Sequence, residues 1–152
     1  AANVRMDQRT DLPASLVIWE DANVLLFVPK AQTSQWEVQI ITKKREDGSW
    51  PGNIIETDTE TRTSLDYALL KAQQALAELG AKMVTSIEFS ARLGRTERMQ
   101  QPLIYALLPK LPFSMGAFSE AQLRFINGHY PEDFAAACRI ALDKLAEQKK
   151  DH

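Results

Sequence analysis

Leu103-Ile104-Tyr105-Ala106-Leu107-Leu108-Pro109-Lys110 is the stretch that decides the fold. Its apolar residues, followed by a proline, predict a buried β-strand that the proline ends. A polar stretch at 90–101 precedes it, and residues 83–89 predict another strand before that stretch. A strand, a polar connection and a second strand are typical of an antiparallel sheet.

More strands are predicted toward the N-terminus. Two apolar runs, residues 16–19 and 24–28, are joined by a short polar connector and predict a β-hairpin. Residues 36–40 alternate between apolar and polar, which places Trp36, Val38 and Ile40 on one buried face of a third strand. A charged loop with glycine and proline, residues 43–56, follows this strand.

Two helices complete the predicted architecture. Thr57 and Glu60 have capping-box spacing, and Gly80 supplies the residue that helices favour just past their ends. The apolar stripe of this first helix consists of Leu65, Leu69, Ala72, Leu76 and Leu79. Pro131 suits the first turn of a second helix, which runs toward the C-terminus. Its predicted buried stripe consists of Phe134, Cys138, Ala141 and Leu145. A short further strand is predicted at 122–126.

The fold class is therefore α+β, with an antiparallel sheet of about five strands, one long helix after the third strand and a C-terminal helix. The chain has 152 residues, 45% of them hydrophobic, which suits one core. We expect an N-terminal arm (1–15), a single domain (16–148) and a polar tail (149–152).

Charge, cysteine content and hydropathy limit the partners and the location. A formal net charge of -2 gives no reason to expect nucleic acid, and no apolar run is long enough to span a membrane. A single cysteine, Cys138, suits a reducing compartment, so we expect a cytoplasmic protein. The chain begins with Ala1 rather than Met, which we interpret as processing, trimming or a piece of something longer.

Several phrases, in their order and spacing, resemble the histidine-triad (HIT-like) superfamily. They are Trp19-Glu20-Asp21, the apolar strand at 25–29, and Leu107-Leu108-Pro109-Lys110. Within the superfamily, the closer likeness is to the C-terminal half of galactose-1-phosphate uridylyltransferase and related nucleotide phosphorylases. The phrases that carry this closer likeness are residues 28–37, Phe113 with Gly116, and Pro131-Glu132-Asp133-Phe134-Ala135 with Arg139. The resemblance covers residues 16–145.

The resemblance implies a catalytic strand whose histidines are missing here. The superfamily's His-x-His-x-His aims three imidazoles from one face of a strand at a phosphate, and the central one forms a nucleotidyl intermediate. Aligned on Pro109 and Lys110, those positions hold Pro102, Ile104 and Ala106. None of these residues can act as a nucleophile or donate a hydrogen bond to phosphate. We therefore expect no catalytic residue on this strand.

The uridylyltransferase resemblance explains this loss, because in that family the C-terminal half supplies substrate contacts and a dimer surface. It implies substrate contacts by Phe113, Met115 and Gly116. The chain departs from the family pattern at Pro112 and at Ala117-Phe118, where a basic residue and a Tyr-Glu pair are absent. Independently, Arg92, Arg95 and Arg98 recur every three residues in the loop before the apolar strand. Arginine forks bind phosphate, so this loop is a second candidate binding site.

Three hypotheses follow. The first is a non-catalytic nucleotide- or nucleotide-sugar-binding half of a nucleotidyltransferase or phosphorylase, acting as a homodimer or paired with a catalytic half. The second is a degenerate domain of the same fold used for protein association or ligand sensing. The third is an enzyme whose catalytic residues have no recognisable pattern. We expect no cofactor and no metal, since His129, Glu132 and Asp133 make only a weak ligand set.

Overall fold

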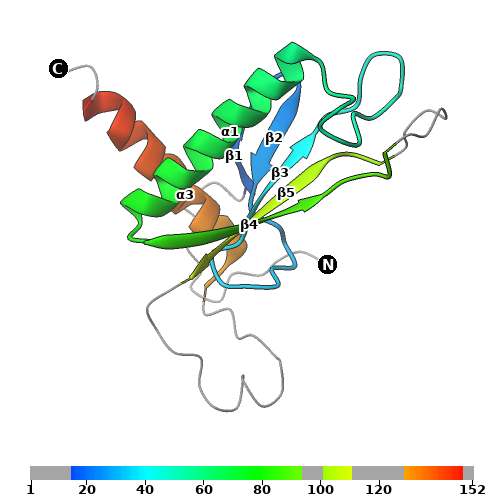
Figure 1. Cartoon of the computed structure of the whole chain (residues 1–152). Helices are drawn as coiled ribbons and strands as arrows, with labels where there is room; N and C mark the ends of the chain where they lie inside the picture. Colours follow the sequence, from blue (N-terminus) through cyan, green and yellow to red (C-terminus); the bar gives the residue numbers. More distant parts are fainter. Residues whose placement is uncertain (1–14, 94–100, 111–128, 149–152) are drawn as a thin grey trace, which may run out of the picture.

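Five antiparallel strands form one sheet with the spatial order β1-β2-β3-β5-β4 in the computed structural model (Figure 1). The structure describes residues 15–93, 101–110 and 129–148. Its elements are β1 (Val17–Glu20), β2 (Val24–Phe27), β3 (Val38–Thr42), α1 (Thr59–Glu78), β4 (Met83–Phe89), β5 (Ile104–Lys110) and α3 (Pro131–Gln148). The α+β class, the antiparallel sheet and the placement of both helices are confirmed. The strand predicted at 122–126 lies outside the described residues, as do the polar tail and nearly all of the N-terminal arm.

The β1–β2 hairpin is held by the polar connector that the sequence places between its strands. The Asp21 carboxylate accepts hydrogen bonds from the backbone N–H groups of Asn23 and Val24, each at 2.8 Å. Such short-range bonds from an aspartate fix a turn without help from the rest of the chain. The Asn23 side chain in turn donates to Ser64 of α1 at 3.1 Å, which ties the hairpin to the helix.

Helix α1 begins one residue later than the capping box predicts. The N-cap is Asp58, whose carboxylate accepts from the Thr61 backbone N–H at 2.7 Å. Aspartate is at least as favourable an N-cap as threonine, which agrees with Asp58 rather than Thr57 capping the helix. The far end agrees with the prediction, because Gly80 follows the last helical turn with a φ of 97°.

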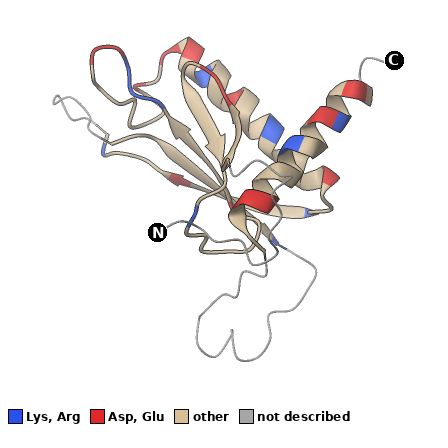
Figure 2. Ribbon diagram, turned by 180° about the vertical axis from the view of Figure 1, so that it is seen from behind, with Lys and Arg blue, Asp and Glu red and all other residues tan. Residues whose placement is uncertain are grey.

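Both helices pack against one face of the sheet. The core cluster joins Leu26 and Ile40 of the sheet to Leu76 of α1 and to Phe134 and Cys138 of α3. Alternate residues of a strand share a face, so Val24, Val38 and Leu107, which are also in this cluster, define the helix-covered face. The strands carry few charges, whereas acidic and basic side chains concentrate on the helices and on the loop before α1 (Figure 2).

Two local predictions differ from the structure. Trp36 is not part of β3; it has a φ of 63° and lies partly buried, stacked on Phe134 with ring centroids 5.6 Å apart. Pro109 does not end β5, which continues to Lys110. Pairing with β3 ends at Leu107, so among the described strands Pro109 pairs with β4 alone. A missing N–H is tolerated at the side of a strand that no described strand pairs with. Among the described residues, no helix has the length and apolar character needed to cross a membrane.

Candidate functional site

The face of β5 that turns away from the helices holds the residues at the expected catalytic positions. Leu107 belongs to the core beneath the helices, and Tyr105 packs against that core. Ile104 and Ala106 alternate with them and therefore project from the opposite face of the sheet. These two positions thus share one face of the strand, as expected from the alternation, but Ala106 is buried and neither residue carries a reactive group.

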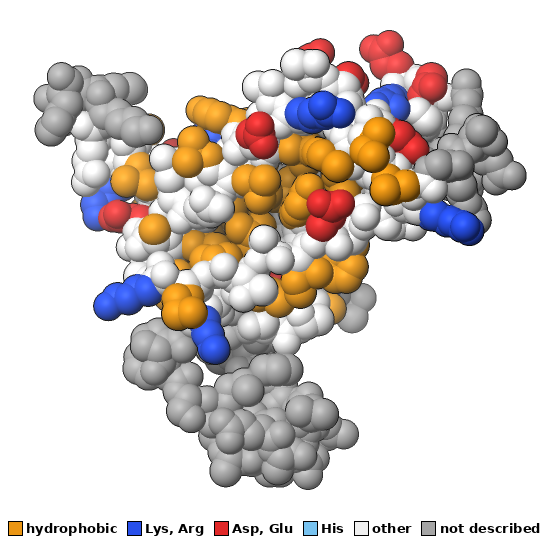
Figure 3. Space-filling model, viewed as in Figure 1, with side chains coloured by type: hydrophobic (Ala, Val, Ile, Leu, Met, Phe, Trp, Pro, Cys, Tyr) orange, Lys and Arg blue, Asp and Glu red, His pale blue; other side chains and the backbone are white. Residues whose placement is uncertain are grey.

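The cross-strand neighbours of these two residues are also mostly apolar. Ile104 lies opposite Ile41 of β3 and Phe89 of β4. Ala106 lies opposite Gln39 of β3 and Ile87 of β4. In Figure 3, hydrophobic side chains gather over the middle of the sheet. This part of the sheet can pack against a flat, weakly polar group, such as a base or a sugar ring, but it offers no nucleophile.

Gln39 is the polar residue on this face of β3, and Glu37 lies just before the strand. Glu37 is 2% exposed, and its carboxylate accepts hydrogen bonds from the Thr33 backbone N–H at 2.7 Å and the Thr33 hydroxyl at 2.8 Å. It also accepts from the Gln39 side-chain amide at 2.8 Å. Glu37 therefore fixes the loop before β3 and orients Gln39 beside Ala106. No sequence motif singles out this pair, although the alternation in residues 36–40 places both residues out of phase with Val38 and Ile40.

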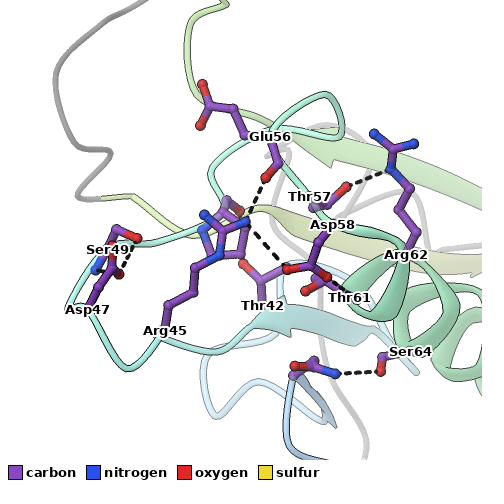
Figure 4. Close-up of polar contacts among 12 residues, drawn as sticks. Thr42, Arg45, Asp47, Ser49, Glu56, Thr57, Asp58, Thr61, Arg62 and Ser64 are labelled. Atoms are coloured by element: carbon purple, nitrogen blue, oxygen red, sulfur yellow. Dashed lines mark hydrogen bonds and ion pairs between the residues drawn. The ribbon is translucent and has the colours of Figure 1, made fainter.

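A second polar cluster surrounds the N-terminus of α1 (Figure 4). Arg45 donates to the Glu56 carbonyl at 2.6 Å and lies 3.9 Å from the Asp58 carboxylate. Arg62 donates to the Thr57 hydroxyl at 3.1 Å and to the Ile54 carbonyl at 3.1 Å. Both guanidinium groups bind acceptors in the loop before α1 and at its N-terminus, so the cluster stabilises this loop rather than forming an anion site.

The acidic cap in this cluster has a lowered pKa. Hydrogen bonds from Thr61 to Asp58 favour the charged carboxylate and hold the pKa of Asp58 below its ordinary value. The Arg45 guanidinium contributes in the same direction. The charged form of Asp58 is thereby stabilised at the positive end of the helix dipole.

The arginines predicted to bind phosphate are described only in part. Arg92 is exposed and follows the end of β4 at which Phe89 pairs with Ile104. Its neighbour Ala91 is buried and donates its backbone N–H to the Gly52 carbonyl at 2.7 Å, which anchors the start of the loop. The rest of the predicted site lies outside the described residues: Arg95, Arg98, Phe113, Met115 and Gly116.

The residues weighed as a weak metal site lie at the start of α3. The His129 ring meets Phe134 edge-on, with centroids 5.3 Å apart, and burial lowers the pKa of His129, an effect that Asp133 opposes. Within the described part of the chain, no group of three His, Cys, Asp or Glu side chains is arranged to hold a metal ion. Cys138 lies on the buried face of α3, and burial raises the pKa of its thiol to about 12.

Comparison with known proteins shows a similarity of fold. No family model and no curated protein matches the sequence. A solved uridylyltransferase matches with a TM-score of 0.67 and 23% identity, over 85% of this chain and 41% of that one. An ADP-glucose phosphorylase from Arabidopsis thaliana, solved with bound ADP-glucose, matches with a TM-score of 0.66 and 22% identity, over 83% of this chain and 40% of that one.

A third match is nearly full-length on both sides. A zinc-bound histidine triad family protein from Mycobacterium smegmatis matches with a TM-score of 0.60 and 18% identity, over 91% of this chain and 90% of that one. The chain thus spans less than half the length of the uridylyltransferase and the phosphorylase, but almost the whole of a single histidine-triad domain. The protein has a HIT-like fold, similar to the folds of the solved uridylyltransferase and of the histidine triad family protein.

Proposed function

We propose that this chain is a non-catalytic HIT-like domain that binds a nucleotide or a nucleotide sugar. The observation that carries the proposal is that Ile104 and Ala106 share the face of β5 that turns away from the helices. Two of the three positions that the resemblance assigns to phosphate-directed side chains lie on that face, but they hold aliphatic residues. Nucleotidyl transfer on this surface has no attacking group, whereas binding needs only contacts.

The ligand class follows from the chemistry around that surface and from the solved neighbours. The neighbours include a uridylyltransferase and a phosphorylase that holds ADP-glucose. In this chain the apolar face of β3, β4 and β5 receives the base or sugar, and the Gln39 amide, held by Glu37, supplies a polar contact. Arg92 begins the loop at the Ile104 end of β5 and is assigned a phosphate contact, as are Arg95 and Arg98, which follow it in the sequence.

Catalysis, if this domain takes part in it, belongs to another segment or another chain that carries the histidines. The whole assembly is then a nucleotidyltransferase or phosphorylase, with this domain as its substrate-binding half. The single cysteine agrees with a cytoplasmic location. A domain that works in protein association is the second candidate, and the exposure of all seven residues of β4 favours it.

The test is a calorimetric titration of the purified chain with UDP-glucose, ADP-glucose, ADP and inorganic phosphate. We expect at least one nucleotide ligand to bind. Substitution of Gln39→Leu should weaken that binding, and joint substitution of Arg92, Arg95 and Arg98 by alanine should weaken it about tenfold or more, which is 1.4 kcal/mol.

The matched control for the glutamine is Gln73→Leu, because Gln73 is exposed on α1, on the far side of the sheet from Ala106. That variant should bind as the unaltered chain does. Absence of binding by every ligand overturns the proposal. Equal binding by the Gln39 and arginine variants means that the site lies elsewhere.

A further inference from the structure

Glu37 is a carboxylate that the fold removes almost completely from water, with 2% of the residue exposed. Hydrogen-bond donors take the place of that water, as a buried carboxylate requires. The backbone N–H and the hydroxyl of Thr33 donate to Oε2 of Glu37 at 2.7 and 2.8 Å. Nε2 of Gln39 donates to Oε1 at 2.8 Å. Both carboxylate oxygens are therefore held, which makes Glu37 a fixed point just before β3.

The bond to Glu37 decides which atom of the Gln39 amide remains available. A carboxylate only accepts hydrogen bonds, and an amide nitrogen only donates them, so it is Nε2 of Gln39 that faces Glu37. The carbonyl oxygen Oε1 is on the other arm of the planar amide and faces away from the carboxylate. Gln39 is partly exposed. Its side chain therefore offers a hydrogen-bond acceptor in a fixed orientation.

The charge of Glu37 strengthens this acceptor and disfavours anions beside it. Donation from Nε2 to an ionised oxygen polarises the amide, which makes its carbonyl oxygen a better acceptor. The second N–H of the Gln39 amide lies on the nitrogen that contacts the same carboxylate, where a phosphate would meet a like charge. The ligand group that suits this position is therefore a neutral donor, such as a hydroxyl or an amino group.

The place of Gln39 on the sheet agrees with a neutral group rather than a phosphate. Gln39 lies between two apolar cross-strand neighbours, Phe27 of β2 and Ala106 of β5. Ala106 is two residues along β5 from Ile104, which marks the end where the loop of Arg92 begins. Two strand residues span about 7 Å. A ligand whose phosphate lies at that loop thus brings its next part, a sugar or a base, to Gln39.

We propose that Gln39 determines the specificity of this surface by accepting a hydrogen bond from a neutral donor of the ligand. Glu37 is the positioning residue, because it holds the Gln39 amide with the oxygen available. The inference rests on the proposed nucleotide site and deepens it. It assigns the class of group that is recognised beside Ala106, a hydroxyl or an amino group, and it excludes phosphate from that position.

The first test is calorimetric titration of the full chain with pairs of ligands that differ in donor groups. UDP-glucose and UDP differ in the hexose hydroxyls, ADP and 2′-deoxy-ADP in a ribose hydroxyl, and ADP and inosine diphosphate in the amino group of the base. In at least one pair, the member that carries the donor should bind about five- to tenfold more tightly. Gln39→Leu should abolish that preference, and the exposed Gln73→Leu control should keep it.

The role of Glu37 is tested by Glu37→Gln. This variant keeps the side-chain volume and an acceptor for Thr33, but the Gln39 amide can then turn either of its ends toward residue 37. The preference within the ligand pair should fall severalfold. In the Gln39→Leu background the same substitution should leave the preference unchanged, because no amide remains to be positioned. Glu60→Gln, at an exposed residue of α1, is the matched control, and circular dichroism confirms that each variant is folded.

A measurement without ligand reports the orientation of the amide directly. The heteronuclear NOE of the Gln39 side-chain amide should be as high as that of the backbone, because Glu37 holds it. The amide of Gln73, which is exposed on α1, is the mobile reference in the same spectrum. Glu37→Gln should lower the value for Gln39 toward that of Gln73.

The outcomes separate this inference from the proposed function. Nucleotides that bind with the same preferences to the unaltered chain and to Gln39→Leu would overturn the contact with Gln39 and leave the nucleotide site standing. Absence of binding by every ligand overturns the nucleotide site and the contact together. Weakening of both members of a pair alike by Glu37→Gln, or a Gln39 amide as mobile as that of Gln73 in the unaltered chain, would overturn the positioning role of Glu37.

Discussion

The two edge strands of the sheet, β1 and β4, are built in opposite ways. Strand β1 has four residues, and its pairing with β2 is irregular between Val17 and Trp19. Arg139 of α3 donates hydrogen bonds to the backbone carbonyls of Ser15 and Val17, which occupies the outward side of this edge. Short length, an irregular register and a covering arginine are the means by which proteins close an edge to further pairing.

Strand β4 has none of these protections. It has seven residues in unbroken register, and the helices cover neither of its faces. Its one charged residue, Glu88, accepts a hydrogen bond from the Tyr105 hydroxyl at 2.8 Å, and burial, together with this carboxylate, raises the pKa of Tyr105 to about 12. The fold therefore places more of its stabilising contacts on the β1 side and leaves the side chains of β4 exposed.

Truncating one apolar side chain near β1 and one on β4 should give the largest difference in the free energy of unfolding. Leu26 is fully buried beneath the helices next to β1, so Leu26→Ala should lower the free energy of unfolding by about 2–5 kcal/mol. Ile87 is 39% exposed on β4, so Ile87→Ala should change it by about 0.5 kcal/mol or less in the monomer. Urea denaturation at low protein concentration measures both. Comparable losses would show that β4 is packed as tightly as the covered strands.

Removal of the arginine that covers β1 should give the next largest effect. Arg139→Met keeps most of the side-chain volume but leaves the carbonyls of Ser15 and Val17 without their charged donor. Hydrogen bonds from charged groups are worth about 1.5–3 kcal/mol, so we expect a loss in that range. Amide hydrogen exchange should also become faster along β1 and stay unchanged along β4. Unaltered exchange at β1 would mean that the short, irregular strand protects this edge without the arginine.

Most of the scaffold follows from local sequence signals, because those signals repeat at the spacing of each element. The bounds of β4 are those predicted, and the β1–β2 hairpin and both helices lie where apolar period and caps place them. The shared face of Ile104 and Ala106 also follows from alternation along one strand. The prediction that these positions carry no catalytic group depends only on residue identity.

What the sequence does not reveal depends on contacts between distant segments. Trp36 continues the alternation of β3, yet its stacking on Phe134 of α3 takes it out of the strand. The extension of β5 through Pro109 depends on where β3 ends, which no local pattern records. The exposure of β4 likewise escapes prediction, because alternating Val, Ile and Phe indicate a strand but do not say whether another layer covers it.

The stability contributed by the turn between β1 and β2 should decrease in acid. Burial works to raise the pKa of Asp21, but hydrogen bonds from Ser64, Val24 and Asn23 outweigh it, and the pKa lies below 3.8. The unfolded chain therefore binds this proton more readily, so the stabilisation is complete above about pH 4–5 and is lost as the pH falls through the folded-state pKa. At neutral pH, Asp21→Ala should cost about 1 kcal/mol.

The control for this prediction is Asp21→Asn, which keeps a side-chain oxygen as acceptor and removes the titration. Urea denaturation of the three proteins at pH 7 and at pH 3.5 separates the two effects. The alanine and asparagine variants should lose less stability between these pH values than the unaltered chain does. An equal loss in all three would assign the acid sensitivity to other carboxylates.

The ion pair beside this turn should matter least for stability. Lys43 lies 2.7 Å from the Glu20 carboxylate and also donates to the Asp21 carbonyl at 2.6 Å. Because the Glu20 side chain is 56% exposed, Glu20→Gln should cost only about 0–1 kcal/mol, and the difference should shrink further in high salt. The backbone bond from Lys43 remains in that variant, so the hairpin keeps its anchor. A cost clearly above 1 kcal/mol that does not change with salt would mean that this ion pair, as well as Arg139, stabilises the β1 edge. The contrast between β1 and β4 would then be electrostatic as much as one of packing.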